Sequence, residues 1–535
     1  MTLAPLCSLA IVALQDGSGL WPHLAAYVLP KALEQTTLLL AGVALMTGTV
    51  GVGCAWLVTS FSFPGRRIAT WLLPLPLAIP TYISAYIYAD FFGAFGPPQT
   101  ALRALTSWQS VRDYWFPDIH SLPGAIFVFG IVLYPYVYLA TQAMMRNQCA
   151  VFVDAARASG ANAGRVAWHV TLPLARPAIA VGLALALLET VNDIGASEYL
   201  GIQTLTLSVF TTWLNRGSLA GAAQIACIML VMVAGLVALE RYGRRKQSFS
   251  TSTQETEALS RIALAGPARW LACLACFIPI TLGFALPVTS LAQEVFKRGL
   301  FLRFDPELLR HAAVTVGFAA SATILTLALS LAAVAALRSE PRPFTAACVN
   351  IGGIGYAIPG TVLALGLLAP LVLIDEGLNA LMRHFMGTSV GLVIAGSGLA
   401  VVIAYAVRFM AIPLGFMRAG FAKIPSEFDD AALLLGARRF TVLRLLYLPL
   451  ARPAIWGAAL LVFVDCMKEL PATLLLRPLN VETLSTYLYQ FASRGNFEEG
   501  ALAALLIVVV SILPVMRMAD FADAAAAHGD QMPPG

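Results

Sequence analysis

The chain has 535 residues, of which 59% are hydrophobic and only 12% charged, and its mean hydropathy is +0.78. A soluble protein carries about 25% charged residues, so a water-facing surface cannot be built here and a soluble enzyme is excluded. The net charge of +5 is modest and gives no indication of a nucleic-acid partner. What remains is an all-α integral membrane protein, because apolar stretches of about 20 residues cross a bilayer as helices.

Continuous apolar stretches predict about twelve transmembrane helices. The first, 3–14, is short and has no basic segment before it, so it is a poor signal peptide. It is expected to form either a short first span or the remainder of a span that starts upstream of Met1. The other eleven stretches lie, in chain order, at 33–61, 68–92, 122–145, 174–190, 219–240, 268–293, 312–337, 345–374, 389–416, 453–466 and 500–516.

The Lys and Arg residues predict the orientation of these helices. With the N-terminus in the cytoplasm, about two thirds of the 34 Lys and Arg residues fall in cytoplasmic segments, as the positive-inside rule requires. In this count Arg408 is the first residue of the cytoplasmic segment 408–452. The cluster of Lys and Arg residues at 297–310 falls on the opposite side and is the one sizeable exception to the rule. Both termini are then predicted to be cytoplasmic.

A polar stretch near the middle of the chain separates two similar halves. Residues 241–267 are predicted to be a cytoplasmic linker between a first half, 1–240, and a second half, 268–535. Residues 154–179 match residues 430–455 without a gap, at an offset of 276, with 14 of 26 positions identical. Six predicted spans separate the two copies, so both copies lie on the basic side, and the halves run parallel.

Each copy of the repeat contains a loop with the same pattern, here called the first repeated loop (154–173) and the second repeated loop (430–449). An acid and two alanines open a helix, a glycine permits a bend or a close contact, and a Leu-Pro pair suits a helix start or a kink. An interfacial helix would explain the pattern, but two identical loops favour docking of a two-fold partner. The residues concerned are Asp154, Ala155, Ala156, Gly160 and Pro173, and Asp430, Ala431, Ala432, Gly436 and Pro449.

The repeated loops resemble the EAA motif of permease subunits of ATP-binding-cassette importers, which runs Glu-Ala-Ala, three residues, Gly, nine residues and Ile-x-Leu-Pro. Both copies keep the spacing, with Asp in place of Glu and Val170 or Leu446 in place of Ile. The resemblance implies that each loop forms a coupling helix in a groove of an ATPase subunit. It also implies an ATPase dimer on the cytoplasmic side, a periplasmic solute-binding protein and a bacterial inner membrane.

The chain also resembles the fused, two-domain permeases of ferric iron importers over nearly its full length. The resemblance is carried by the stretches 189–196, 217–224 and 468–478. It implies ferric iron as the solute, moved from the periplasm to the cytoplasm. Fused permeases for thiamine and phosphonates share this architecture, so these solutes stay as alternatives.

The chain lacks the residues for ATP hydrolysis. A Walker A loop needs Gly-Lys-Ser or Gly-Lys-Thr, and none of the five lysines follows a glycine. ATP and magnesium are therefore expected on a partner subunit, with no cofactor and no catalytic residue in this chain. The six histidines are dispersed, and no metal-binding spacing of His and Cys is present.

Five residues near the bilayer are candidates for the translocation path. Glu189 matches Asp465 at the offset of 276, Asp193 matches Glu469, and Lys468 takes the place of Asn192. Ionisable groups at membrane depth are costly and usually face a cavity or a partner. The acids would suit a cationic solute, but Lys468 could instead pair with Asp465 or Glu469 and hold helices together, or the groups could be hydrated at the outer interface.

Two further alternatives concern function. The tyrosines at 134, 136 and 138, with those at 82, 86 and 88, could in principle bind ferric iron, but interface or packing roles are expected. An ion-driven secondary transporter also uses parallel repeats, and its acidic residues would be ion sites. Such a transporter has no reason to repeat a docking loop, and this favours the ATPase-coupled importer. A membrane scaffold would explain the loops but not the paired charges.

Overall fold

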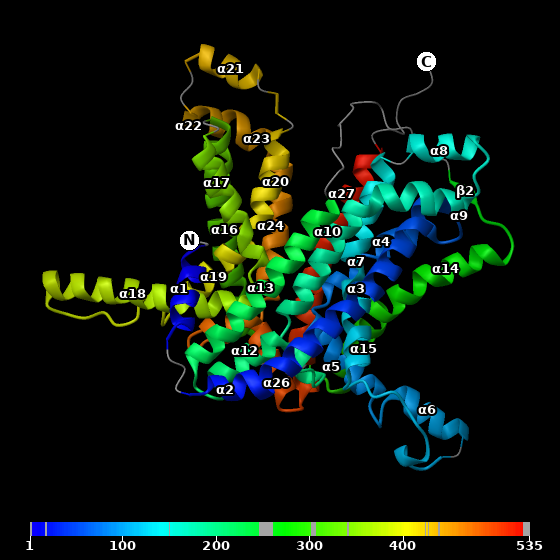
Figure 1. Cartoon of the computed structure of the whole chain (residues 1–535), viewed down its shortest axis with the longest axis horizontal. Coiled ribbons are helices and arrows are strands. Elements are labelled where there is room, and N and C mark those ends of the chain that lie inside the picture. Colours follow the sequence, from blue (N-terminus) through cyan, green and yellow to red (C-terminus); the bar gives the residue numbers. More distant parts are fainter. Residues whose placement is uncertain are drawn as a thin grey trace. The chain divides into compact units, whose positions relative to one another are not determined.

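The computed structural model describes residues 3–15, 19–106, 108–148, 150–244, 261–300, 306–339, 342–422, 424–425, 427–436 and 439–527 (Figure 1). Up to residue 244 the helices are α1 (Leu3–Ala13), α2 (Trp21–His23), α3 (Leu29–Ser60), α4 (Arg66–Leu72), α5 (Thr81–Phe92), α6 (Pro97–Thr106), α7 (Leu122–Gln148), α8 (Ala150–Ala158), α9 (Ala163–Val166), α10 (Leu172–Asn192), α11 (Gly195–Tyr199), α12 (Leu205–Leu214) and α13 (Leu219–Arg244). After residue 260 they are α14 (Pro267–Ile280), α15 (Leu286–Lys297), α16 (Pro306–Ser339), α17 (Pro343–Gly352), α18 (Gly360–Met386), α19 (Gly398–Phe409), α20 (Ala411–Ala422), α21 (Glu427–Leu434), α22 (Arg439–Val442), α23 (Leu448–Leu450), α24 (Arg452–Met467), α25 (Pro471–Leu476), α26 (Leu484–Ser493) and α27 (Ala501–Ala527).

Within the described residues, eight helical segments are long and apolar enough to cross a membrane, and eleven if each of three bent pairs is one span. These eleven overlap, one for one, the eleven predicted stretches that follow the N-terminal one. The bends measure 96°, 46° and 68°. They lie in the segments 66–106, 398–422 and 443–467, which contain prolines, and proline removes a helical hydrogen bond and clashes with the preceding turn.

One predicted span, 345–374, is wrong at both ends. The chain forms α17 and then a 3-10 turn at Gly353–Ala357, and the span-length helix α18 begins only at Gly360. Gly352 and Gly353 weaken the helix, and Pro359 restricts the residue before it. Hydropathy does not register this break, because the surrounding residues stay apolar throughout.

Four helices contain a π-helical turn directly before a Leu-Pro pair. The turns are Leu24–Val28, Ala167–Thr171, Thr281–Ala285 and Leu443–Tyr447. A proline has no N–H and its ring collides with the carbonyl one turn earlier, and a wider turn relieves that collision. The amide of Leu172 accordingly bonds back to the carbonyl of Ala167, and that of Leu448 to Leu443. The helix therefore continues through both repeated Leu-Pro pairs.

The chain divides into two compact units by its contacts. Unit 1 comprises Met1–Ala25, Ser208–Leu230 and Arg303–Gln490, and unit 2 comprises Ala26–Leu207, Val231–Leu302 and Phe491–Gly535. Each unit draws on residues from both predicted sequence halves. The two predicted halves follow from the sequence repeat and do not coincide with the two units defined by contacts. The boundaries of the halves therefore stay a prediction.

In unit 1, α16 packs against α24, α20 and α19, and α1 packs against α18. A Cβ added at Gly366 of α18 would lie 2.3 Å from the carbonyl oxygen of Pro5, so the two helices touch through their backbones. The short N-terminal stretch thus forms an 11-residue helix that is seated in unit 1. This is shorter than the about 20 residues that a perpendicular crossing needs.

In unit 2, α3, α7 and α10 pack against one another (Figure 1). Tyr134 and Tyr138 on α7 are fully buried, and their hydroxyls donate to the carbonyls of Leu73 (2.9 Å) and Thr70 (3.4 Å). Both residues therefore have the packing role that is expected for them.

The predicted linker 241–267 is described only at its two ends, since residues 245–260 lie outside the described part of the chain. Its second end is anchored. Strand β2 (Ile262–Ala263) pairs in parallel with β1 (Phe61–Ser62), and the amide of Leu264 donates to the carbonyl of Ser62 at 3.1 Å.

Candidate functional site

The first repeated loop closes its opening helix, α8, with a Schellman motif. The amide of Ala161 bonds to the carbonyl of Ala156 (3.1 Å), and the amide of Gly160 bonds to that of Arg157 (2.9 Å). This motif needs a left-handed residue after the helix, and Gly160 has φ +83°. Asn162 then caps α9 by accepting from the amide of Arg165 at 2.9 Å, and the π-helical turn and α10 follow.

The second repeated loop repeats this backbone. Gly436 has φ +74° and follows α21, where the amide of Leu435 bonds to the carbonyl of Ala431 at 3.1 Å. A Cβ added at Gly436 or Gly160 would meet no atom of the chain within 4 Å. Of the two roles predicted for these glycines, the structure therefore shows the bend and not a close contact inside the chain.

The opening helices place one motif alanine outward and one inward. Ala155 and Ala431 are exposed, whereas Ala156 and Ala432 are half-buried against apolar clusters beneath them. The side chains of Asp154 and Asp430 lie outside the described part of the structure. The loops carry the spacing of the EAA motif on the same backbone in both copies.

Large apolar side chains stand exposed on both repeated loops. Trp168 is 73% exposed in the first, and Leu434 and Leu435 are 89% and 86% exposed in the second. Exposed apolar patches on a folded surface mark sites of protein or membrane contact. This arrangement suits a docking surface, and it suits an interfacial helix as well.

Two of the predicted path residues are helix caps at equivalent positions. Asp193 accepts through Oδ1 from the amide of Ala196 (2.7 Å) and also accepts from the hydroxyl of Thr81. Glu469 accepts through Oε1 from the amide of Ala472 at 3.1 Å. Each acid thus satisfies a free N–H at the start of the short helix that follows its span, α11 or α25.

Glu469 has a second partner that the sequence did not indicate. The guanidinium Nε of Arg408 lies 3.4 Å from Glu469 Oε2, and both residues are almost fully buried. A Cβ at Gly360 would lie 2.7 Å from both Arg408 Nη1 and Glu469 Oε1, so this glycine leaves room for the pair. The placement of Arg408 in a cytoplasmic segment is therefore wrong, because the residue lies inside the bent span 398–422. The sequence did hold a signal for this pairing, because an ionisable residue inside an apolar stretch usually faces a partner or a cavity.

The remaining path candidates are less buried. Lys468 Nζ lies 2.8 Å from Asp465 Oδ1, in the pairing that had been considered as the structural alternative. Glu189 is half-buried on α10. Asp465, Lys468 and Glu469 thus lie together in unit 1, and Glu189 and Asp193 in unit 2. That these residues line a path stays a prediction.

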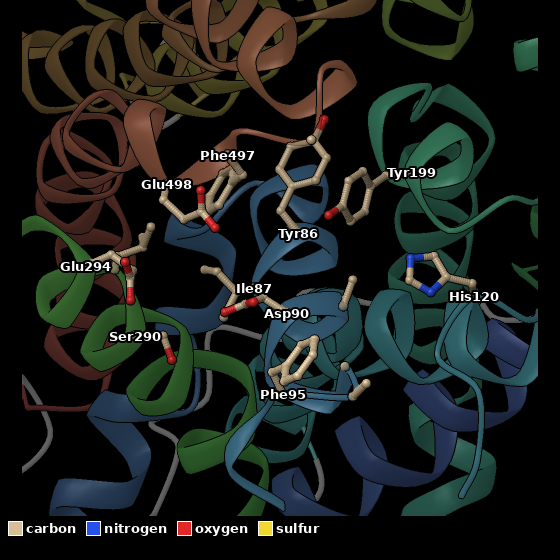
Figure 2. A pocket seen from close by; sticks show the side chains of 15 residues that line it. Tyr86, Ile87, Asp90, Phe95, His120, Tyr199, Ser290, Glu294, Phe497 and Glu498 are labelled. Atoms are coloured by element: carbon tan, nitrogen blue, oxygen red, sulfur yellow. The ribbon is translucent and has the colours of Figure 1, made fainter. Parts of the chain in front are cut away.

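A cavity of about 250 Å³ opens in unit 2 at the end of α5 that is predicted to face the periplasm. Figure 2 shows three carboxylates around it, from Asp90, Glu294 and Glu498, together with the aromatic side chains of Tyr86, Tyr199 and Phe497. Arg298 pairs with Glu498 at 3.3 Å and with Glu294 at 3.4 Å. Asp90 forms no ion pair with any described residue, so its charge is the least compensated of the three.

The aromatic wall of this cavity is tightly packed. The ring of Tyr86 lies edge-on to that of Tyr199, with centroids 4.4 Å apart, and 4.9 Å from that of Phe497. Burial raises the pKa of the Tyr199 hydroxyl above its ordinary value, and the charges of Asp90 and Glu498 raise it further. Tyr199 is therefore neutral at physiological pH and can donate a hydrogen bond into the cavity.

The sequence did not single out this cavity, because its carboxylates come from three distant segments that only folding brings together. Within the described residues, no group of three or more His, Cys, Asp or Glu side chains is placed to hold a metal ion.

Comparison with known proteins places the chain in a family. The model of the binding-protein-dependent transport system inner membrane component matches residues 48–247 and 312–528, which together are most of the chain and include both repeated loops. The chain belongs to this family. It is a multi-pass inner-membrane permease of the ATP-binding-cassette importer type, with the family domain present twice in one chain. Family membership implies an ATPase and a solute-binding protein as partners.

Two relatives match nearly the full length of this permease. It is 23% identical to the Fe(3+)-transport system permease protein FbpB 2 of Haemophilus influenzae over 499 residues, which cover 92% of this chain and 90% of the relative. It is 25% identical to the probable permease y4fN of Sinorhizobium fredii, covering 90% and 85%. The sulfate transport system permease CysW of Escherichia coli is 28% identical over 225 residues, 40% of this chain and 74% of the relative.

Proposed function

We propose that this permease moves ferric iron from the periplasm to the cytoplasm, driven by a separate ATPase dimer that docks on the two repeated loops. ATP-driven closure of the dimer would shift both loops and switch the side on which the path opens. A solute-binding protein would deliver the iron at the outer face, and the ATPase would bind ATP and magnesium. This chain would contribute no catalytic residue, and both of its termini would be cytoplasmic.

The observation that carries the coupling role is the duplicated loop. In both copies the same spacing of acid, alanines, glycine and Leu-Pro is built on one backbone, with a left-handed glycine and a π-helical turn. Exposed apolar side chains on both loops offer contact area to a partner. A transporter that works without an ATPase would have no use for two matched docking elements, which argues against an ion-driven carrier.

Ferric iron as the solute is supported by the relative from Haemophilus influenzae, whose name assigns it Fe(3+) transport and which matches nearly the whole chain. The Asp90 carboxylate at the outer cavity of unit 2, which forms no ion pair with any described residue, is also favourable for a cation. The sulfate permease among the relatives shows that the family carries anions as well. Phosphonates, which are anions, therefore stay as alternative solutes, and so does thiamine, whose permeases share the architecture.

Uptake by living cells tests this proposal. Iron-starved cells that lack the chain would be compared with cells complemented by the intact gene, with radiolabelled ferric iron, thiamine, aminoethylphosphonate and sulfate supplied in parallel. Selective loss of iron uptake, restored by the gene, is expected. Normal iron uptake together with a defect in another solute would keep the permease and overturn iron as its cargo.

The path residues are tested in the same cells. Glu189→Gln and Asp465→Asn remove two charges at equivalent positions, and uptake is expected to fall if the solute passes them. Glu34→Gln is the matched control, because Glu34 is an exposed carboxylate on the span α3. Unchanged uptake by both variants, with the complex intact, would show that the acids do not line the path.

A further inference from the structure

The end of span α16 is tied to the second repeated loop through one arginine. Arg338, in the last turn of α16, places its guanidinium Nε 2.7 Å from Oδ2 of Asp429, which lies on the loop helix α21. The arginine is only 16% exposed and the aspartate 24%. This salt bridge is therefore shielded from water and from salt in part.

The other nitrogens of the same guanidinium bind the segment that leads into the loop. Nη1 donates to the carbonyl of Phe421, and Nη2 donates to the carbonyl of Ile424 at 2.8 Å. Phe421 is in the last turn of α20, where carbonyls have no partner inside the helix and favour a cation. Arg338 thus connects three elements: the span α16, the end of α20 and the start of α21.

A tyrosine from the far end of the loop completes the cluster. The hydroxyl of Tyr447 donates to the second oxygen of Asp429 at 2.8 Å, and the Arg338 guanidinium carbon lies 5.2 Å from the centre of the Tyr447 ring. Both oxygens of Asp429 are therefore held. The planar guanidinium makes these contacts in fixed directions, which a lysine cannot reproduce.

The first repeated loop has a different attachment. At the offset of 276, Asp429 corresponds to Val153 and Tyr447 to Thr171. Val153 is buried in an apolar cluster with Val166, Ala156 and Leu174. Apolar contacts are not directional and tolerate small sliding, whereas forked charged hydrogen bonds do not.

We propose that Arg338 is a positioning residue that fastens the second repeated loop to span α16, so that a displacement of this loop by the ATPase passes directly into the membrane. The first loop has Val153 in place of Asp429 and Thr171 in place of Tyr447, so it lacks this bridge and transmits less. This inference rests on the proposed coupling function. It assigns Arg338, Asp429 and Tyr447 a role in transmission that is separate from docking itself.

Hydrogen–deuterium exchange on the full-length chain in lipid nanodiscs tests the attachment without any partner or solute. In Arg338→Met, peptides from 427–434 should exchange about tenfold faster, because a hydrogen-bonded charge pair of this kind is lost. Peptides from 155–160 should not change. Arg338→Lys keeps the charge but not the forked hydrogen bonds of the guanidinium. The exchange rate of 427–434 in this variant should lie between those of the unaltered chain and of Arg338→Met.

Arg418→Met is the matched control. Arg418 is a half-buried arginine on α20, and it bonds to Asn350 of α17 (2.9 Å) rather than to the loop. Exchange in 427–434 should stay at its normal rate in this variant. Unchanged exchange in Arg338→Met, or an equal rise in Arg418→Met, would overturn the attachment.

The role in transmission needs a second readout, the amount of radiolabelled ferric iron taken up per ATP hydrolysed by the copurified ATPase complex. A merely structural role would lower both quantities together through loss of assembled complex, and the ratio would not move. We expect the ratio to fall several-fold in Arg338→Met and to recover partly in Arg338→Lys. An unchanged ratio alongside faster exchange would overturn the positioning role.

Failure of the proposed function would look different. The intact chain would then support no ATP-driven uptake at all, whereas the exchange experiment would still decide whether Arg338 fixes α21.

Discussion

In the first repeated loop, Val153 and Val166 hold the opening helix by apolar packing, whereas in the second loop Arg338 holds it by charged hydrogen bonds. The backbones match, with a left-handed glycine and a π-helical turn at equivalent positions. The same contrast recurs at the acid caps, where Asp193 accepts from the neutral Thr81 and Glu469 pairs with the charged Arg408. The two halves have thus kept the backbone and changed the side chains that fasten it.

The largest expected effect comes from the acid caps. Arg408→Met leaves the buried Glu469 carboxylate without its guanidinium, and breaking a buried pair in this way costs about 3–5 kcal/mol. Thr81→Val removes a neutral donor from Asp193 and should cost only about 1–2 kcal/mol. Denaturant unfolding of the purified chain measures both free energies. Equal losses of unfolding free energy in the two variants would show that the charged partner of Glu469 matters no more than the neutral partner of Asp193.

The loop glycines should behave alike in both copies. Gly160→Val and Gly436→Val force a β-branched residue into the left-handed region, at a cost of about 1–2 kcal/mol each. Uptake should fall strongly in both, and Asn variants should retain more of it, because Asn tolerates this conformation. Gly164→Ala is the control, since Gly164 lies in α9 with an open environment and an ordinary φ. A loss of uptake in only one of the two Val variants would mean that the two loops do not contribute equally to transport.

The apolar attachment of the first loop predicts a moderate effect. Val153→Ala removes two buried methyl groups and should loosen α8 by about 1–2 kcal/mol. Hydrogen exchange should rise in peptides from 155–160 and stay unchanged in 427–434, the reverse of the pattern expected for Arg338→Met. A rise in both loops would show that they are not fastened independently.

The smallest effect is expected from salt. Raising the ionic strength to about 1 M shortens the screening length to about 3 Å and weakens partly exposed charge pairs. Exchange in the second repeated loop should therefore increase about two-fold, and exchange in the first loop should not increase. Salt sensitivity of the first loop alone would contradict the assignment of apolar and charged attachments.

Much of the fold followed from hydropathy and the repeat. The eleven stretches after the N-terminus overlap the observed spans, and the two copies of the repeat share their backbone from the loop helix to the π-helical turn. After the Leu-Pro pair they differ, because α10 continues unbroken whereas the second copy bends by 68° between α23 and α24. The break before Gly360 was missed because its residues are apolar, and a hydropathy sum does not register backbone geometry. Arg408 was misplaced because the charge count begins its cytoplasmic segment at 408, inside the predicted span 389–416, where the residue is flanked by apolar residues on both sides.

The candidate site could be predicted where its residues are contiguous. The acid, alanines, glycine and Leu-Pro of each repeated loop stand in one stretch, so their spacing is visible in the sequence. The pairing of Lys468 with Asp465 was also within reach, because the residues are one helical turn apart. The cavity beside Asp90 could not be predicted from the sequence, since its lining residues come from segments about 200 residues apart.

The sequence by itself determined the membrane class, the duplication and the two repeated loops, because composition, periodicity and spacing are properties of a chain read in order. Tertiary structure decided how those loops are held. Arg338 and Asp429 are 91 positions apart. Arg408 lies on α19, whereas Glu469 lies in the link between α24 and α25. No local pattern links such partners. The packing of α16, α20 and α21 around the first pair, and of α18, α19 and α25 around the second, removes enough water to make these charged contacts directional and strong.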